Sequence, residues 1–124
     1  MPKTEVNFYC EADDDVPVLD WLDEVADRTP KAASKCRAAI ERLKELGHEL
    51  RRPEADILRD DIYELRVGLQ GINYRILYFF HGRNVALLAH GLIKEKEVPD
   101  VDINRAIERR RRFLEAPDKH TYEV

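Results

Sequence analysis

The spacing of hydrophobic residues changes along the chain and divides it into a helical part and a strand part. Up to residue 47, apolar residues recur every three or four positions, as on one face of a helix. Over residues 57–94 they alternate with polar residues or run almost continuously, as in β-strands. The pattern predicts a short strand near residues 5–10, two helices, three strands and a last helix.

The two predicted helices follow each other with almost no linker. The acidic loop 11–15 ends in an aspartate that can cap the first helix, and Pro17 is tolerated in its first turn. Thr29 is expected to cap the second helix, with Pro30 at its first position and Gly47 as its stop. So short a connection predicts an antiparallel helical hairpin.

The strand part predicts an antiparallel meander. Its strands are expected at 62–67, 72–80 and 85–93, the first preceded by an acidic kink, with turns at 68–71 and 81–84. The last strand is nearly all apolar, which predicts a central or well-covered position. After Pro99, Asp100 or Asp102 can cap a final helix that Pro117 closes. The length suits a single domain over residues 1–116, followed by a polar tail at 117–124.

Pairing arithmetic suggests which side chains share a sheet face. With turns at 68–71 and 81–84, Arg75 lies opposite Glu64 on one side and opposite His90 on the other. Since residues two apart share a face, this register gathers one polar set: Glu64, Arg66, Asn73, Arg75, His90 and Lys94.

The polar face has two interpretations that the residues alone leave open. It can be a solvated sheet face in which Arg75 and Glu64 form a cross-strand pair. It can also be a phosphate cradle, since arginine forks phosphate oxygens and histidine carries a proton near neutral pH.

Charge weakens a nucleic-acid role without removing it. The chain of 124 residues has 21 basic and 25 acidic side chains, a net charge of −4. The basic residues are concentrated in one place, because Arg105 and the run 109–112 stand together while residues 1–28 are mostly acidic. This distribution allows a locally basic surface.

The N-terminus has no apolar run behind a basic start, which predicts no signal peptide and a cytoplasmic location. The sequence contains no apolar run long enough for a membrane span. Cys10 and Cys36 are then expected as reduced thiols in the core, and their surroundings lack the Cys or His spacing of a zinc site.

An ordered set of short motifs resembles a known toxin group. The set comprises the segments 58–66 (LRDDIYELR), 74–78 (YRILY) and 90–94 (HGLIK), then Pro99 and a helix with Ile103, Ala106 and Arg109 to Arg111. In this order they resemble the phage-derived, HigB-like branch of the RelE/ParE superfamily of bacterial type II toxins. The likeness extends over more than half of the chain.

The resemblance implies an α+β, RelE-like fold. An N-terminal helical hairpin and a C-terminal helix would pack on one face of a small curved antiparallel sheet, in the order β-α-α-β-β-β-α. It also implies a helix-turn-helix antitoxin as partner and cleavage of messenger RNA, often on the ribosome. In that reaction a ribose 2′-OH attacks the neighbouring phosphate, with no metal or cofactor.

Carried over onto this sequence, the resemblance makes Arg75 the phosphate clamp, with Arg66 and Lys94 as further catalytic cations. His90 has the ordinary pKa of a proton carrier, but beside Gly91 in an apolar strand it is equally a core residue. The expected RNA-binding residues are Lys96, Arg109, Arg112 and Tyr74, although Tyr74 falls on the core face and the arginines can be solvated or internally paired.

Two departures from the family pattern keep other functions open. Glu95 stands where many relatives have a second lysine, and the chain is acidic where many ribosome-dependent members are basic. The alternatives are a ParE-like toxin that blocks DNA gyrase without catalysis, and an inert protein-binding relative of the toxins.

Overall fold

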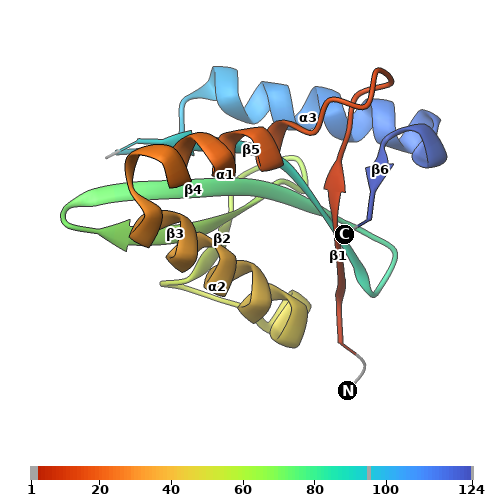
Figure 1. Ribbon diagram of the computed structural model, residues 1–124. Coiled ribbons are helices and arrows are strands. Elements are labelled where there is room, and N and C mark those ends of the chain that lie inside the picture. The colour runs from red at the N-terminus through yellow and green to blue at the C-terminus, as the bar shows by residue number, and fades with distance from the viewer. Residues whose placement is uncertain (1–2, 95, 124) are drawn as a thin grey trace.

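A mixed β-sheet runs through the middle of the protein, with helices on both of its faces (Figure 1). The computed structural model describes residues 3–94 and 96–123, and in these the sheet has six strands and there are three α-helices. In chain order the elements are β1 (Glu5–Tyr9), α1 (Pro17–Arg28), α2 (Pro30–Leu46), β2 (Ala55–Ile57), β3 (Tyr63–Leu69), β4 (Ile72–His81), β5 (Val85–Ile93), α3 (Asp100–Glu115) and β6 (Thr121–Tyr122). Short 3-10 turns follow α2 at Gly47–Glu49 and α3 at Pro117–Lys119.

The helical hairpin forms where the apolar periodicity placed it. Each helix begins at a proline, and Thr29 is the single residue between them. The expected aspartate cap of α1 is wrong, because Val16 occupies the cap position and no side chain bonds the free amides there. The expected aspartate cap of α3 is wrong too, since Pro99 precedes that helix. In both cases a proline beside the helix start fixes the backbone without a capping side chain.

The purely antiparallel sheet of the expected fold is wrong. The strand order is β2-β3-β4-β5-β1-β6, and β1 runs parallel to β5, from Glu5 opposite Val85 to Phe8 opposite Leu88. The meander leaves one edge of β5 open, and β1 fills it. The strand order also gains β2 and β6, of which β6 pairs with β1 and brings part of the expected polar tail into the sheet.

The helices do not all pack on one face, as was expected. Helices α1 and α2 cover one face, while α3 covers the other with Ile103, Ala106 and Phe113 (Figure 1). The reason is the apolar character of β5 on both sides: Leu88 packs toward the helical hairpin and Leu87 toward α3. A strand that is apolar on both faces requires cover on both. Both cysteines, Cys10 and Cys36, are buried in the hairpin-side core, as predicted.

The predicted registers are wrong by two residues. The β3–β4 turn consists of Gln70 and Gly71 alone, with φ of 52° and 80°. Positive φ at both positions is the geometry of a two-residue hairpin turn whose twist matches the strands. Arg75 therefore lies opposite Arg66, not Glu64.

On the other side of β4, the pairing with β5 shifts by one residue between Leu77 and Tyr78, where Ala89 of β5 is the extra residue of a bulge. The turn before it is also one residue shorter than predicted, since His81 pairs with Val85. Together the two changes place Arg75 opposite Leu92 and His90 opposite Leu77. On both neighbouring strands, the residue opposite Arg75 is two positions away from the predicted one. A register error of two residues leaves every side chain on its predicted face. The predicted polar face thus survives a wrong register.

Candidate functional site

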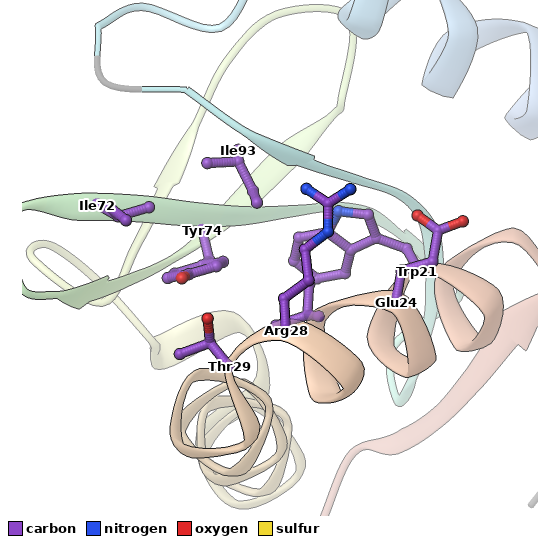
Figure 2. A pocket seen from close by; sticks show the side chains of 8 residues that line it. Trp21, Glu24, Arg28, Thr29, Ile72, Tyr74 and Ile93 are labelled. Atoms are coloured by element: carbon purple, nitrogen blue, oxygen red, sulfur yellow. The ribbon is translucent and has the colours of Figure 1, made fainter.

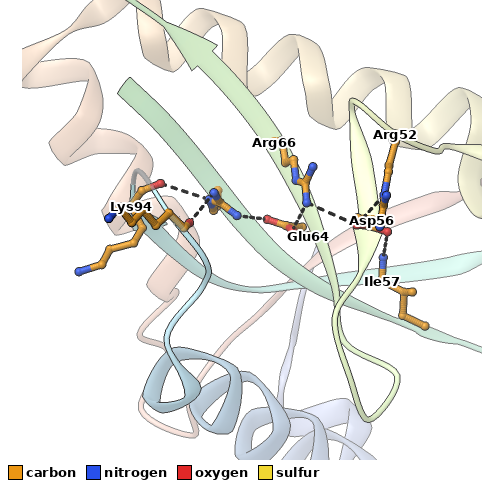
Figure 3. A network of polar contacts seen from close by, with 8 residues as sticks. Arg52, Asp56, Ile57, Glu64, Arg66 and Lys94 are labelled. Carbon is orange, nitrogen blue, oxygen red and sulfur yellow. Dashed lines mark hydrogen bonds and ion pairs between the residues drawn. The ribbon is translucent and has the colours of Figure 1, made fainter. Parts of the chain in front are cut away.

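A network of charged side chains crosses the sheet from β2 to the segment that follows β5 (Figure 3). Its centre is Glu64 on β3, whose side chain is only 1% exposed. Glu64 accepts one hydrogen bond of 2.8 Å from Arg75 Nη1 and another of 3.0 Å from Arg66 Nη2. Arg66 also lies 3.4 Å from Asp56 on β2, which is bonded to Arg52 at 2.8 Å. Acids and arginines alternate along the network, so each buried charge has a partner.

Arg75 is the most enclosed cation of the network, with a side chain 10% exposed. Besides the bond to Glu64, its Nε donates to the carbonyl of Lys94 at 3.3 Å, and its Nη2 to the carbonyl of Lys96 at 2.6 Å. Arginine has five N–H donors in a planar fork, and at least three are used here. Arg75 thus fixes the backbone on both sides of residue 95 to the sheet.

Three of the predicted cations of this surface are exposed to solvent: Arg66, Lys94 and Lys96. The Lys94 side chain extends away from the network in Figure 3, while its backbone carbonyl accepts from Arg75. The structure therefore brings the predicted residues Arg66, Arg75, Lys94 and Lys96 to one region. Arg75 lies in its floor, and the other three lie at its rim.

The structure directs His90 toward α3. Its Nε2 lies 2.7 Å from Asp102 Oδ1, and its Nδ1 lies 3.2 Å from Arg109 Nη1. A neutral ring protonated at Nε2 satisfies both contacts, because it donates to Asp102 and accepts from Arg109. Burial lowers the pKa of His90 and outweighs the opposing effect of Asp102. His90 is therefore neutral at pH 7, with both nitrogens occupied.

The predicted RNA-binding arginines of α3 are paired within the protein. Arg112 Nη1 lies 2.9 Å from Glu11 Oε2, and Arg109 Nε lies 3.8 Å from Glu11 Oε1. Arg109 also donates to the carbonyl of Ala89 at 2.7 Å, and burial lowers its pKa. The hollow in which these arginines lie is lined by further carboxylates, from Asp13, Asp15 and Glu108. Such a lining offers little net attraction to a phosphate.

Tyr74 lies apart from all of these residues. It is 3% exposed on the hairpin side of the sheet, where it packs in the core and lines a groove beside Trp21.

Sequence reasoning missed the acids that contact the predicted site residues: Asp56 beside Arg66, Asp102 beside His90 and Glu11 beside the α3 arginines. One available signal was the separation of charge along the chain. An acidic N-terminal segment and an arginine-rich C-terminal helix attract each other, and Glu11 with Arg112 realises that attraction.

Comparison with protein families identifies a match over most of the chain. The model of the family described as Phage derived protein Gp49-like (DUF891) matches residues 20–111, which is more than half of the chain. The chain belongs to this family. It is a phage-derived, toxin-like family related to the RelE and HigB toxins, and a toxin-like protein suggests an antitoxin as partner. No curated protein matches the chain.

Two searches of residues 3–94 and 96–123 gave negative results. No group of three or more His, Cys, Asp or Glu side chains there is arranged to hold a metal ion. None of the helices there has the length and apolar character that a bilayer crossing needs.

Proposed function

We propose that this chain is the toxin of a type II toxin–antitoxin pair, of the HigB-like branch, and that it cleaves messenger RNA. The Gp49-like membership supports a toxin. The observation that carries the RNA-cleaving part is the buried Glu64–Arg75 pair with Arg66 and Lys94 exposed beside it. An enclosed arginine with exposed cations beside it suits a phosphate whose negative charge increases in the transition state.

The proposed reaction is attack of a ribose 2′-OH on the adjacent phosphate, which leaves a 2′,3′-cyclic end and a free 5′-OH. Arg66 and Lys94 contact the phosphate, and Lys96 binds the neighbouring backbone. Arg75 contributes positive charge from below and holds the carbonyls of Lys94 and Lys96 in place. In this proposal the protein's own cations stabilise the charge without a metal or cofactor, and the substrate is messenger RNA.

Both ring nitrogens of His90 already have partners, which limits its role in proton transfer. Its two nitrogens are bound to Asp102 and Arg109 and its pKa is lowered, so it is poorly placed to exchange protons with a substrate at neutral pH. We therefore assign the rate enhancement chiefly to charge stabilisation by Arg66, Arg75 and Lys94. His90 is the weakest member of the predicted catalytic set.

The occupied ring of His90 also favours a second candidate, a non-catalytic toxin that blocks DNA gyrase in the manner of ParE. Expression without antitoxin separates the two. Primer extension on cellular RNA should show new 5′ ends soon after induction, while a supercoiling assay stays normal. Loss of supercoiling with intact RNA would favour the gyrase inhibitor. Normal growth with neither effect would indicate an inert binding protein.

Two variants test the proposed surface. Arg66→Ala and Lys94→Ala should each lower the cleavage rate about 10²–10³-fold, the usual effect of removing one transition-state donor. The matched controls are Arg83→Ala and Lys31→Ala, which remove exposed cations from the β4–β5 turn and from α2. Cleavage by the Arg66 and Lys94 variants at the parent's rate would exclude this surface as the site.

A further inference from the structure

An apolar groove lies on the hairpin side of the sheet, where the C-terminal part of α1 meets one end of β4 and β5 (Figure 2). Its volume is about 280 Å³. Its lining is mainly apolar, with one acid and one base: Trp21, Glu24, Val25, Arg28, Thr29, Ile72, Tyr74 and Ile93.

Two large aliphatic side chains of this groove are exposed. Ile72 is 40% exposed and Ile93 is 49% exposed. They begin β4 and end β5, and both line the groove together with the Trp21 and Tyr74 rings. Single exposed apolar residues are common, but several around one concave surface indicate a binding site.

The Trp21 wall is fixed in place. Its indole lies against the backbone of Gly91 on β5, where an added Cβ would stand 2.3 Å from Trp21 Cδ2. Only glycine permits so close an approach. The groove is therefore formed before any partner arrives, which reduces the entropic cost of binding.

The surface of α1 around the groove is acidic. Asp20, Asp23, Glu24 and Asp27 are exposed on this helix, against Arg28 alone. Across the part of the chain that the structure describes, Asp23, Glu24 and Asp27 have no ion-pair partner. Their charge is left to attract a basic partner.

We propose that this groove is the docking site of the antitoxin, which inserts one large apolar side chain between Trp21 and Ile93 and places lysines or arginines along α1. The identity of the partner rests on the proposed function. The location rests on the apolar walls and the unpaired carboxylates. Tyr74 and Ile93 are backbone partners, and Arg75 follows Tyr74 on the other face of β4, so the docked segment lies behind the catalytic network.

The test uses the full chain and the purified protein encoded beside its gene. Titration calorimetry gives the affinity, and the fluorescence of Trp21, the single tryptophan of the chain, reports directly on the groove. Ile72→Glu and Ile93→Glu should each weaken binding about 10-fold or more, as for a buried anchor. The double variant Asp23→Lys/Asp27→Lys, at exposed positions, should also weaken binding and reduce its salt dependence.

The matched controls are Val101→Glu and Leu114→Glu on α3, which are exposed to 64% and 47%. They should bind as the parent does. Unfolding curves for each variant establish that it folds. Binding by the groove variants at parental strength would overturn the proposal.

Growth inhibition, measured separately, distinguishes the possible failures. If the parent inhibits growth and binds its neighbour, but the groove and charge variants bind equally well, the docking site is wrong and the toxin assignment stands. If the parent does not bind the protein encoded beside its gene, the docking proposal is wrong. Whether the parent inhibits growth then decides the proposed function. If the parent forms a dimer that Ile93→Glu disrupts, the occupant is a second copy and the antitoxin proposal is wrong.

Discussion

Glu64 and Arg75 form a 2.8 Å ion pair although neither is the backbone partner of the other. Across β3 and β4, Arg75 lies opposite Arg66, and Glu64 lies opposite Leu77, so the contact is diagonal. Two arginines directly opposite each other would repel. Glu64 accepts from both and offsets that repulsion, which explains why a carboxylate is retained at a position only 1% exposed.

Removal of the central carboxylate should destabilise the fold. In Glu64→Gln the charge that Arg66 and Arg75 share is lost, and Arg75 remains buried without a counter-ion. The free energy of unfolding should fall by about 3–5 kcal/mol, the usual cost of breaking a buried pair from one side. Urea denaturation measures it. Glu54→Gln, which breaks the exposed pair with Arg42, is the control and should change stability far less. Equal effects of the two variants would contradict a central role for Glu64.

Conversion of Arg75 to lysine keeps the charge but removes the fork. One ammonium group cannot reach Glu64 and the carbonyls of Lys94 and Lys96 with the geometry of three separate donors. The Lys94 amide, which is bonded to the carbonyl of Asn73 at 3.1 Å, should exchange its hydrogen faster in Arg75→Lys. Hydrogen exchange followed by NMR measures this. Arg83→Lys should leave that rate unchanged. Parental protection of Lys94 in Arg75→Lys would show that Arg75 does not hold the segment.

His90 should make stability depend on pH in the acid range. Burial lowers its pKa below the ordinary value of about 6.5, so between the two pKa values the unfolded chain binds a proton that the folded chain does not. Stability is then fully present above about pH 6.5 and falls as the pH drops below it. The groups facing the ring are Asp102, Arg109 and Arg105. In His90→Gln the decline should be shallower, as urea midpoints from pH 8 to 5 will show. An unchanged slope would place the titration elsewhere.

A methyl group at Gly91 should disturb the Trp21 wall. The Cβ of Gly91→Ala would meet the indole at 2.3 Å, so the helix or the ring must move. Overpacking of this kind costs about 1–3 kcal/mol, and the fluorescence of Trp21 should shift. Gly68→Ala is the matched control, because its nearest neighbour would be the Asn73 side chain at 3.8 Å. Equal stability of the two variants would indicate that Trp21 has room to adjust.

The positions of the helices and main strands could be predicted because periodicity and proline act locally. Apolar spacing of three to four gave α1 and α2, and Pro17 and Pro30 marked their starts. The faces of β3 and β4 also followed from alternation alone, so Arg66 and Arg75 were placed together despite a wrong register.

The candidate site could be predicted only in part. A pairing error of two residues leaves the face unchanged, which is why Glu64 and Arg75 were expected to meet and do. The partners of His90 could not be predicted, because they come from α3 and local periodicity does not show on which sheet face that helix packs. Arg109 reaches His90 only because α3 lies over β5.

By itself the sequence determined what is local: where the chain coils, where it extends, and which strand residues share a face. The tertiary structure decided what depends on contacts between distant segments. It placed β1 parallel to β5, put α3 on the face opposite the helical hairpin, and enclosed Arg75 between Glu64 and two carbonyls. The physical reason is that backbone periodicity depends on near neighbours, whereas sheet order and buried ion pairs depend on how the apolar faces of the elements cover one another.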